Sequence, residues 1–170
     1  MRKFDNRKKI LTEIIANIDE EKLNEVLNSE EYKIYNALIT AEGAIKLALT
    51  YSKMGIALTK VVLIGYGRIG KVLSKMLVGM NANLIIIESN KTERMRAKSQ
   101  GFTVCESSNF ENIDIVFNTA ENYHIKETEA LFIDLSSSNK GDINASSLAE
   151  EVATLKEVLY IKEEICRRTL

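Results

Sequence analysis

From residue 60 onward, short runs of apolar residues alternate with stretches in which apolar residues recur at helical spacing. Runs this apolar are typical of strands that are buried on both faces of a parallel sheet. Six such runs, separated by helical stretches, predict an α/β fold: a Rossmann-type doubly wound parallel sheet with strand order 3-2-1-4-5-6. The runs lie at residues 61–64, 83–87, 102–105, 114–118, 131–135 and 158–161.

Before residue 60 the spacing of apolar residues is helical. One stripe extends over residues 10–27, and Thr40 precedes another, where its hydroxyl can cap the start of a helix. We therefore expect a helical lead-in over residues 1–39 and a Rossmann-type domain over residues 40–170. The segment 8–53 carries more aliphatic residues than one sheet face can cover, which predicts a homodimer through these helices.

The first predicted strand runs directly into the sequence GYGRIG at residues 65–70, and a helical pattern follows. Strand, glycine turn and helix in this order are typical of dinucleotide-binding proteins. Gly65 permits the tight turn, Gly67 lets the backbone approach a pyrophosphate, and Gly70 lets the helix pack closely. The N-terminus of the helix, from about Arg68, offers N–H donors and a partial positive charge to the phosphates.

Glu88 ends the second predicted strand, where a carboxylate normally accepts hydrogen bonds from both hydroxyls of the adenosine ribose. A 2′-phosphate beside this carboxylate would meet a repulsion of up to ~4 kcal/mol per charge pair at 4 Å and an effective dielectric constant of 20. NAD is therefore the expected cofactor, and NADP is disfavoured.

Further polar residues follow the fourth and fifth predicted strands. Asn118 and Thr119 either contact the nicotinamide ribose or cap the strand, and Asp134 either orients ribose or substrate or forms a turn. His124 is the single histidine, so a histidine acid–base mechanism must use it; its alternative is an exposed loop residue. No cluster of metal-ligand spacing is present, and no metal is expected. The predicted cofactor-binding residues are Gly65, Tyr66, Gly67, Arg68, Ile69, Gly70, Glu88, Ser89, Asn118, Thr119 and Asp134.

Composition excludes several classes of protein. The formal net charge of −1 argues against a nucleic-acid-binding protein, which needs a clustered basic surface. No apolar run approaches the roughly 20 residues that a membrane span requires. Cys105 and Cys166 have no CxxC spacing, so we expect reduced thiols and a cytoplasmic location.

Three stretches resemble a known family. The stretches are IYNALITAEGAIKLALTYSKMGIALTKVVLIGYGRIGKVLSKML (34–77), DIVFNTA (114–120) and LFIDLSS (131–137). They are similar to the nicotinamide-dinucleotide domain in the A subunits of dipicolinate synthases, a family of enzymes found in spore-forming bacteria. The resemblance implies a link to sporulation. It also implies a pyridine-nucleotide-dependent oxidation of a cyclic dihydrodipicolinate precursor to dipicolinate, the calcium-chelating acid of spores.

The chain departs from that family's pattern at several turns. Ile39 and Glu121 stand where the family has prolines, and residues 138–141 read SNKG in place of RPGG. We expect the family's substrate-side domain and its loop after the sixth strand to have no counterpart in this chain. We expect the chain to bind a dinucleotide without forming dipicolinate on its own. The alternatives are a second subunit that completes the enzyme, a non-catalytic NAD(H)-binding sensor or regulatory module, or a methyltransferase, which the GYGRIG spacing disfavours.

Overall fold

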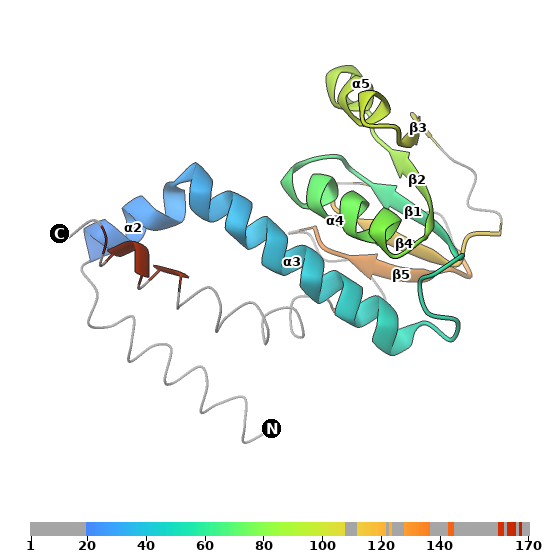
Figure 1. The fold of residues 1–170 in the computed structure, drawn as a ribbon, viewed down its shortest axis with the longest axis horizontal. Helices are drawn as coiled ribbons and strands as arrows, with labels where there is room; N and C mark the ends of the chain where they lie inside the picture. The colour runs from blue at the N-terminus through green and yellow to red at the C-terminus, as the bar shows by residue number, and fades with distance from the viewer. Residues whose placement is uncertain are drawn as a thin grey trace.

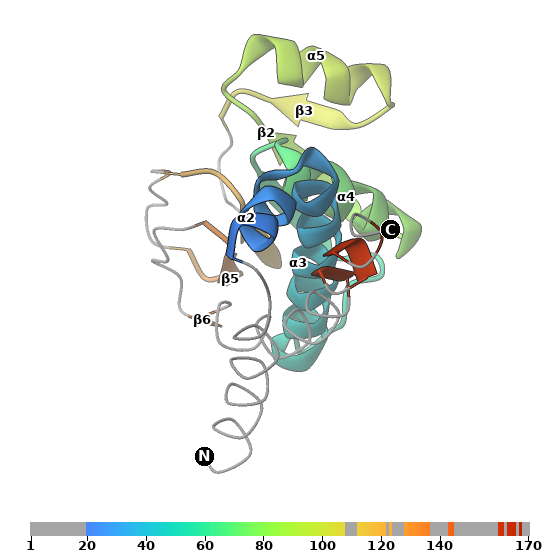
Figure 2. The ribbon, with the colours of Figure 1, turned by 90° about the vertical axis from the view of Figure 1, so that its left-hand side faces the viewer.

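A parallel sheet forms the centre of the molecule. The computed structural model describes residues 20–107, 112–121, 123, 128–136, 143–144, 160–161, 163–165 and 167. Within them the sheet has six strands in the order β3-β2-β1-β4-β5-β6, and every neighbouring pair is parallel. Figure 1 labels β1 to β5, and Figure 2 labels β6. The predicted Rossmann-type architecture and strand order are confirmed.

The strands and helices alternate along the second half of the chain, as the hydrophobic pattern predicts. The strands are β1 (Lys60–Ile64), β2 (Asn83–Ile87), β3 (Thr103–Cys105), β4 (Ile115–Asn118), β5 (Leu131–Asp134) and β6 (Ile143–Asn144). The helices are α2 (Glu20–Asn28), α3 (Glu30–Tyr51), α4 (Arg68–Gly79) and α5 (Lys91–Ser99). None of the helices that the structure describes has the length and apolar content of a membrane span.

The two central strands, β1 and β4, are buried on both faces because their side chains alternate between two apolar clusters. Leu63 and Phe117 lie in the cluster that includes Leu47 of α3 and Leu73 of α4. The intervening residues, such as Val62, lie in a second cluster on the opposite face. Each fully buried aliphatic or aromatic side chain of this kind contributes about 1.5–3 kcal/mol, so this sandwich holds the strand ends in register.

Helix α3 is one continuous helix, and it begins eleven residues earlier than the sequence pattern predicts. Ser29 caps it, with its hydroxyl accepting from the backbone N–H of Tyr32 at 3.2 Å, and Glu30 follows in the first turn. Thr40 is therefore not a cap: it lies inside the helix, where its hydroxyl donates to the carbonyl of Asn36 at 2.8 Å. The expected boundary between residues 39 and 40 falls within α3.

The prediction of a sixth strand at 158–161 is wrong at Tyr160 and Ile161, which are helical; the sixth strand is β6, which pairs with β5. The reason is that the apolar run at 158–161 is compatible with a strand, whereas the spacing of Ile161 and Ile165 is that of a helix. Ile161 belongs to the apolar cluster around Val26 of α2, and Ile165, four residues further on, packs against that cluster. Figure 2 shows this short helical segment, in red, beside α3. Tyr160 stacks on Tyr35 of α3 with ring centroids 4.3 Å apart.

Candidate functional site

The turn between β1 and α4 requires glycine at two positions because of its own geometry. Gly65 has a φ of +92°, and a Cβ there would lie 2.6 Å from Oγ1 of Thr119. A Cβ on Gly70 would lie only 2.2 Å from the carbonyl oxygen of Gly65. These two glycines let the first turn of α4 press against the chain that leaves β1. Both roles agree with the sequence-based interpretation of the motif.

Gly67 differs from both. Its φ is −73°, which any residue can adopt, and a Cβ there would meet no described atom within 4 Å. Gly67 is also the N-cap of α4, without a side-chain cap hydrogen bond. The first N–H groups of a helix have no partner inside it and carry a partial positive charge. The turn therefore offers donors and free space at the same point.

Glu88, at the end of β2, fixes the glycine turn through a hydrogen bond to its backbone. One carboxylate oxygen accepts from the backbone N–H of Tyr66 at 2.7 Å, and the other accepts from that of Asn90 at 2.7 Å. The side chain is half-buried. A carboxylate has roughly four acceptor sites, so each oxygen retains one for a further donor such as a ribose hydroxyl.

The side chain of Tyr66 points away from the turn and into the core. It is fully buried, packs edge-on against Phe102 with centroids 5.9 Å apart, and its hydroxyl donates to Gln100 at 3.3 Å. Burial raises the pKa of this hydroxyl. A contact between Tyr66 and a ligand is therefore restricted to its backbone.

Arg94 of α5 fastens the chain immediately after β2. Its Nη1 donates to the carbonyl oxygens of Glu88 at 2.8 Å and Ser89 at 2.5 Å, and Nη2 lies 3.5 Å from a carboxylate oxygen of Glu106. Ser89 itself is exposed. The guanidinium of Arg94 is thus engaged by the protein rather than presented to a ligand at the tip of β2.

Arg68, the first residue of α4, forms a two-pronged ion pair with Glu30 of α3. Nε lies 2.8 Å from one carboxylate oxygen and Nη2 lies 3.2 Å from the other. The hydrogen bond lowers the pKa of Glu30 and raises that of Arg68. The pair is exposed to solvent, so it contributes little to the stability of the fold; it joins the start of α4 to the start of α3.

Asn118 and Asp134 occupy paired positions at the ends of β4 and β5, and both are buried. Nδ2 of Asn118 donates to Oδ1 of Asp134 at 3.0 Å, and the N–H of Ser136 donates to the same oxygen at 2.9 Å. Oδ1 of Asn118 accepts from the N–H of Ala120 at 3.1 Å. These side chains hold the two strand ends together.

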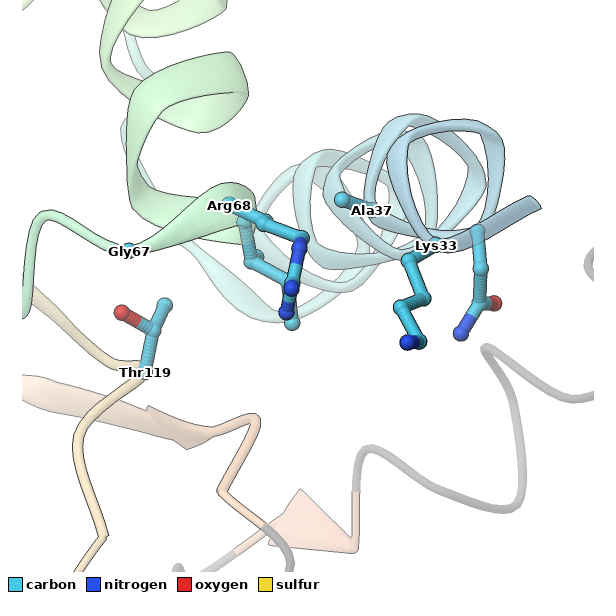
Figure 3. Close-up of a pocket in the computed structure, with 7 residues that line it drawn as sticks. Lys33, Ala37, Gly67, Arg68 and Thr119 are labelled. Carbon is cyan, nitrogen blue, oxygen red and sulfur yellow. The ribbon is translucent and has the colours of Figure 1, made fainter. Parts of the chain in front are cut away.

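A cleft of about 250 Å³ lies between the turn and α3. Figure 3 shows the turn and Thr119 on one side and α3 on the other. The hydroxyl of Thr119 donates to the carbonyl of Ile64 at 2.9 Å, which fixes this wall of the cleft to β1. The lining residues are Gly67, Arg68, Ile69 and Thr119, together with Lys33, Asn36 and Ala37 of α3.

Sequence reasoning identified the turn and Thr119 but missed the α3 wall, because it assigned residues 1–39 to a lead-in. The available signal was the polar pair Lys33 and Asn36, which stand three residues apart and so share one face of a helix. His124 lies outside the described residues. Among the residues that the structure describes, no group of three or more His, Cys, Asp or Glu is placed to bind a metal.

Comparison with known proteins places this geometry in context. No family model matches the chain. The A subunit of dipicolinate synthase from Bacillus subtilis (strain 168) is 25% identical over 136 residues, which cover 74% of this chain and 46% of that protein.

Solved structures show the same fold. Those of the dipicolinate synthase A subunits from Bacillus halodurans and Bacillus subtilis each have a TM-score of 0.69, with 19% and 22% identity, and they cover 84% of this chain. The match covers 57% and 55% of those chains, so this chain spans about half the length of its relatives. L-tryptophan dehydrogenase from Nostoc punctiforme has a TM-score of 0.51 at 20% identity, over 72% of this chain and 40% of that one. The predicted resemblance is therefore confirmed: the chain is similar in sequence and fold to part of the A subunit of dipicolinate synthase.

Proposed function

We propose that this chain binds NAD(H) at the turn between β1 and α4. The observation that supports this most strongly is Gly67, where neither the backbone conformation nor packing among the described residues requires a glycine. A pyrophosphate that approaches the backbone at this point does require one. The free N–H groups and the partial charge at the start of α4 supply the matching donors.

The choice of NAD over NADP follows from Glu88. Its carboxylate is already fixed by two backbone N–H groups, and it retains acceptor sites for ribose hydroxyls. A 2′-phosphate at that position would face an immobile negative charge. Arg94, a cation on the helix that follows β2, is engaged with the backbone carbonyls of Glu88 and Ser89.

The proposed binding is tested by titrating the protein with NADH and NADPH, using calorimetry or nicotinamide fluorescence. We expect a Kd for NADH in the micromolar range, and a Kd for NADPH several-fold higher. Binding of neither nucleotide at millimolar concentration would contradict the proposal. Equal or tighter binding of NADPH would contradict the role given to Glu88 alone.

As the activity we propose the NAD-linked oxidation of a dihydrodipicolinate precursor, which this chain carries out only together with a second protein that supplies the substrate side. Bound NAD would accept the hydride. The second candidate is a non-catalytic NAD(H)-binding sensor or regulatory module. The mutual hydrogen bonding of Asn118 and Asp134 favours this second candidate, because it engages polar groups at the strand ends. NADH production from freshly generated precursor, measured with and without added partner proteins, separates the two. Turnover that requires a partner protein supports the oxidoreductase, and turnover by the chain alone would contradict the expectation that it needs a partner. Nucleotide binding without turnover in either assay supports the sensor.

We also propose a homodimer through segment 8–53. Of this segment, the structure describes α2 and α3, and Ile34, Leu38 and Leu49 of α3 are 56%, 38% and 51% exposed. Burying such side chains against a second copy removes apolar surface from water. Light scattering at tens of micromolar is expected to give about twice the chain mass of 19.1 kDa. A mass near 19.1 kDa would contradict the dimer.

A further inference from the structure

The α3 side of the cleft carries a cation that the GYGRIG motif does not include. Lys33 lines the cleft, and Figure 3 shows it on the wall across from Gly67 and Thr119. Its side chain is half-buried. The residue belongs to α3, so only the packing of α3 beside the turn brings it to the site.

Lys33 differs from Arg68, the other cation that lines the cleft. Both prongs of the Arg68 guanidinium are engaged by Glu30. In the part of the chain that the structure describes, no carboxylate forms an ion pair with Lys33. The charge of Lys33 does lower the pKa of Glu30, but less than the Arg68 hydrogen bond does. Lys33 therefore keeps its donors for a ligand.

The cleft is thus positive on two sides. The N-terminus of α4 presents backbone donors on one side, and the Lys33 ammonium stands on the other. The remaining lining contains no carboxylate. A diphosphate carries a negative charge on each phosphate, and its oxygens can accept from both sides at once.

We propose that Lys33 forms an ion pair with the diphosphate of the bound dinucleotide and so closes the site from α3. The proposal rests on the function proposed above. Arg68 acts as a positioning residue in this scheme: its ion pair with Glu30 keeps the start of α3 beside the start of α4. The cation that binds phosphate is thus Lys33 of α3, although the motif itself contains an arginine.

The test compares Lys33→Gln with Lys46→Gln. Lys46 lies on the same helix, is exposed and does not line the cleft, so its replacement makes the same charge change away from the site. The Kd values for NADH and for ADP-ribose are measured at low and high salt. Charge-assisted hydrogen bonds to phosphate weaken with salt, so their loss also flattens the salt dependence.

We expect Lys33→Gln to weaken NADH and ADP-ribose alike by about ten-fold and to flatten the salt dependence of both. Lys46→Gln should stay within two-fold of the wild type, and Lys33→Arg should recover most of the lost affinity. Circular dichroism melting checks that every variant folds.

Unchanged NADH affinity and salt dependence in Lys33→Gln would overturn the inference while leaving the proposed function intact. A ten-fold loss with Arg68→Gln and none with Lys33→Gln would overturn it as well. Absence of NADH binding by the wild-type protein is the separate result that would refute the proposed function itself.

Discussion

Two stretches of the same sheet edge use polar residues in opposite ways. At the ends of β1 and β2, Glu88 is half-buried with acceptor sites to spare, and Gly67 faces open space. At the ends of β4 and β5, Asn118 and Asp134 are only 2% and 3% exposed and bind each other. The first stretch is held in place by hydrogen bonds but keeps acceptor sites and space for a ligand. In the second stretch the polar side chains use their hydrogen-bonding groups on each other and on the neighbouring backbone.

This difference shows what a polar residue after a strand does and does not indicate. Sequence position alone predicts that all of these residues lie at the carboxyl ends of the parallel strands, and they do lie there. Burial and mutual hydrogen bonding then separate the residues that remain available to a ligand from those that hold the chain. The β1–β2 end is accordingly the part of the edge to which we assign binding.

The largest expected effect is on the fold, from a change inside the glycine turn. Gly70→Val would place its side chain against the carbonyl of Gly65, whose oxygen lies 2.2 Å from the point that a Cβ on residue 70 would occupy. Overpacking of this kind costs about 1–3 kcal/mol and occasionally more, and we expect the upper end here because the obstacle is backbone. Urea denaturation measures the loss. A midpoint equal to that of the wild type would show that the turn is looser than this geometry implies.

Asp134→Ala should affect stability while leaving nucleotide affinity unaltered. It removes the acceptor of both the Asn118 amide and the Ser136 N–H, and unsatisfied buried donors cost about 1–3 kcal/mol. The free energy of unfolding should fall by that amount, and the Kd for NADH should change by less than three-fold. If affinity fell ten-fold in a variant that is still folded, the contrast between the two ends of the edge would be lost.

Glu88→Gln tests the other half of the comparison, the ends of β1 and β2. It removes the negative charge that disfavours a 2′-phosphate. Its amide oxygen can still accept from the N–H of Tyr66, whereas the N–H of Asn90 loses its acceptor. The ratio of NADPH to NADH affinity should rise by about ten-fold, which corresponds to about 1.4 kcal/mol. Parallel titrations with the two nucleotides provide the measurement. An unchanged ratio would mean that other groups determine cofactor choice.

Thr119→Val gives the smallest effect. The hydroxyl of Thr119 donates to the carbonyl of Ile64, which also accepts from the Thr119 N–H at 2.8 Å, so the carbonyl keeps one partner after the change. We expect the free energy of unfolding to fall by about 0.5–1.5 kcal/mol. Thermal denaturation detects a shift of this size. A loss well above this range would mean that the hydroxyl has a larger role in holding the turn.

The strands and the glycine turn were predictable because both leave local signals. Continuous apolar runs mark β1 and β4, and the spacing of Gly65 and Gly70 marks the turn. The sixth strand was not predictable, since β6 has two residues and leaves no apolar run. The helical turn at Ile161 fits an apolar run equally well, and only its packing against α2 reveals its conformation.

The α3 wall of the site was not predictable for a different reason. Lys33 and Arg68 are 35 positions apart in the chain, and nothing local to either indicates that they line one cleft. The pairing of Arg68 with Glu30 likewise depends on how α3 crosses α4. Contacts of this kind follow from the packing of whole helices, which periodicity indicates only as a buried face.

The central claim is that a dinucleotide occupies the open space next to Gly67. The most direct test is to titrate Gly67→Val and its control Gly79→Val with NADH. Both glycines have no described atom within 4 Å of a Cβ, but Gly79 lies at the far end of α4. We predict that Gly67→Val loses at least about 100-fold in NADH affinity with its melting temperature kept, and that Gly79→Val binds as the wild type does. Equal NADH affinity in all three proteins would contradict the account.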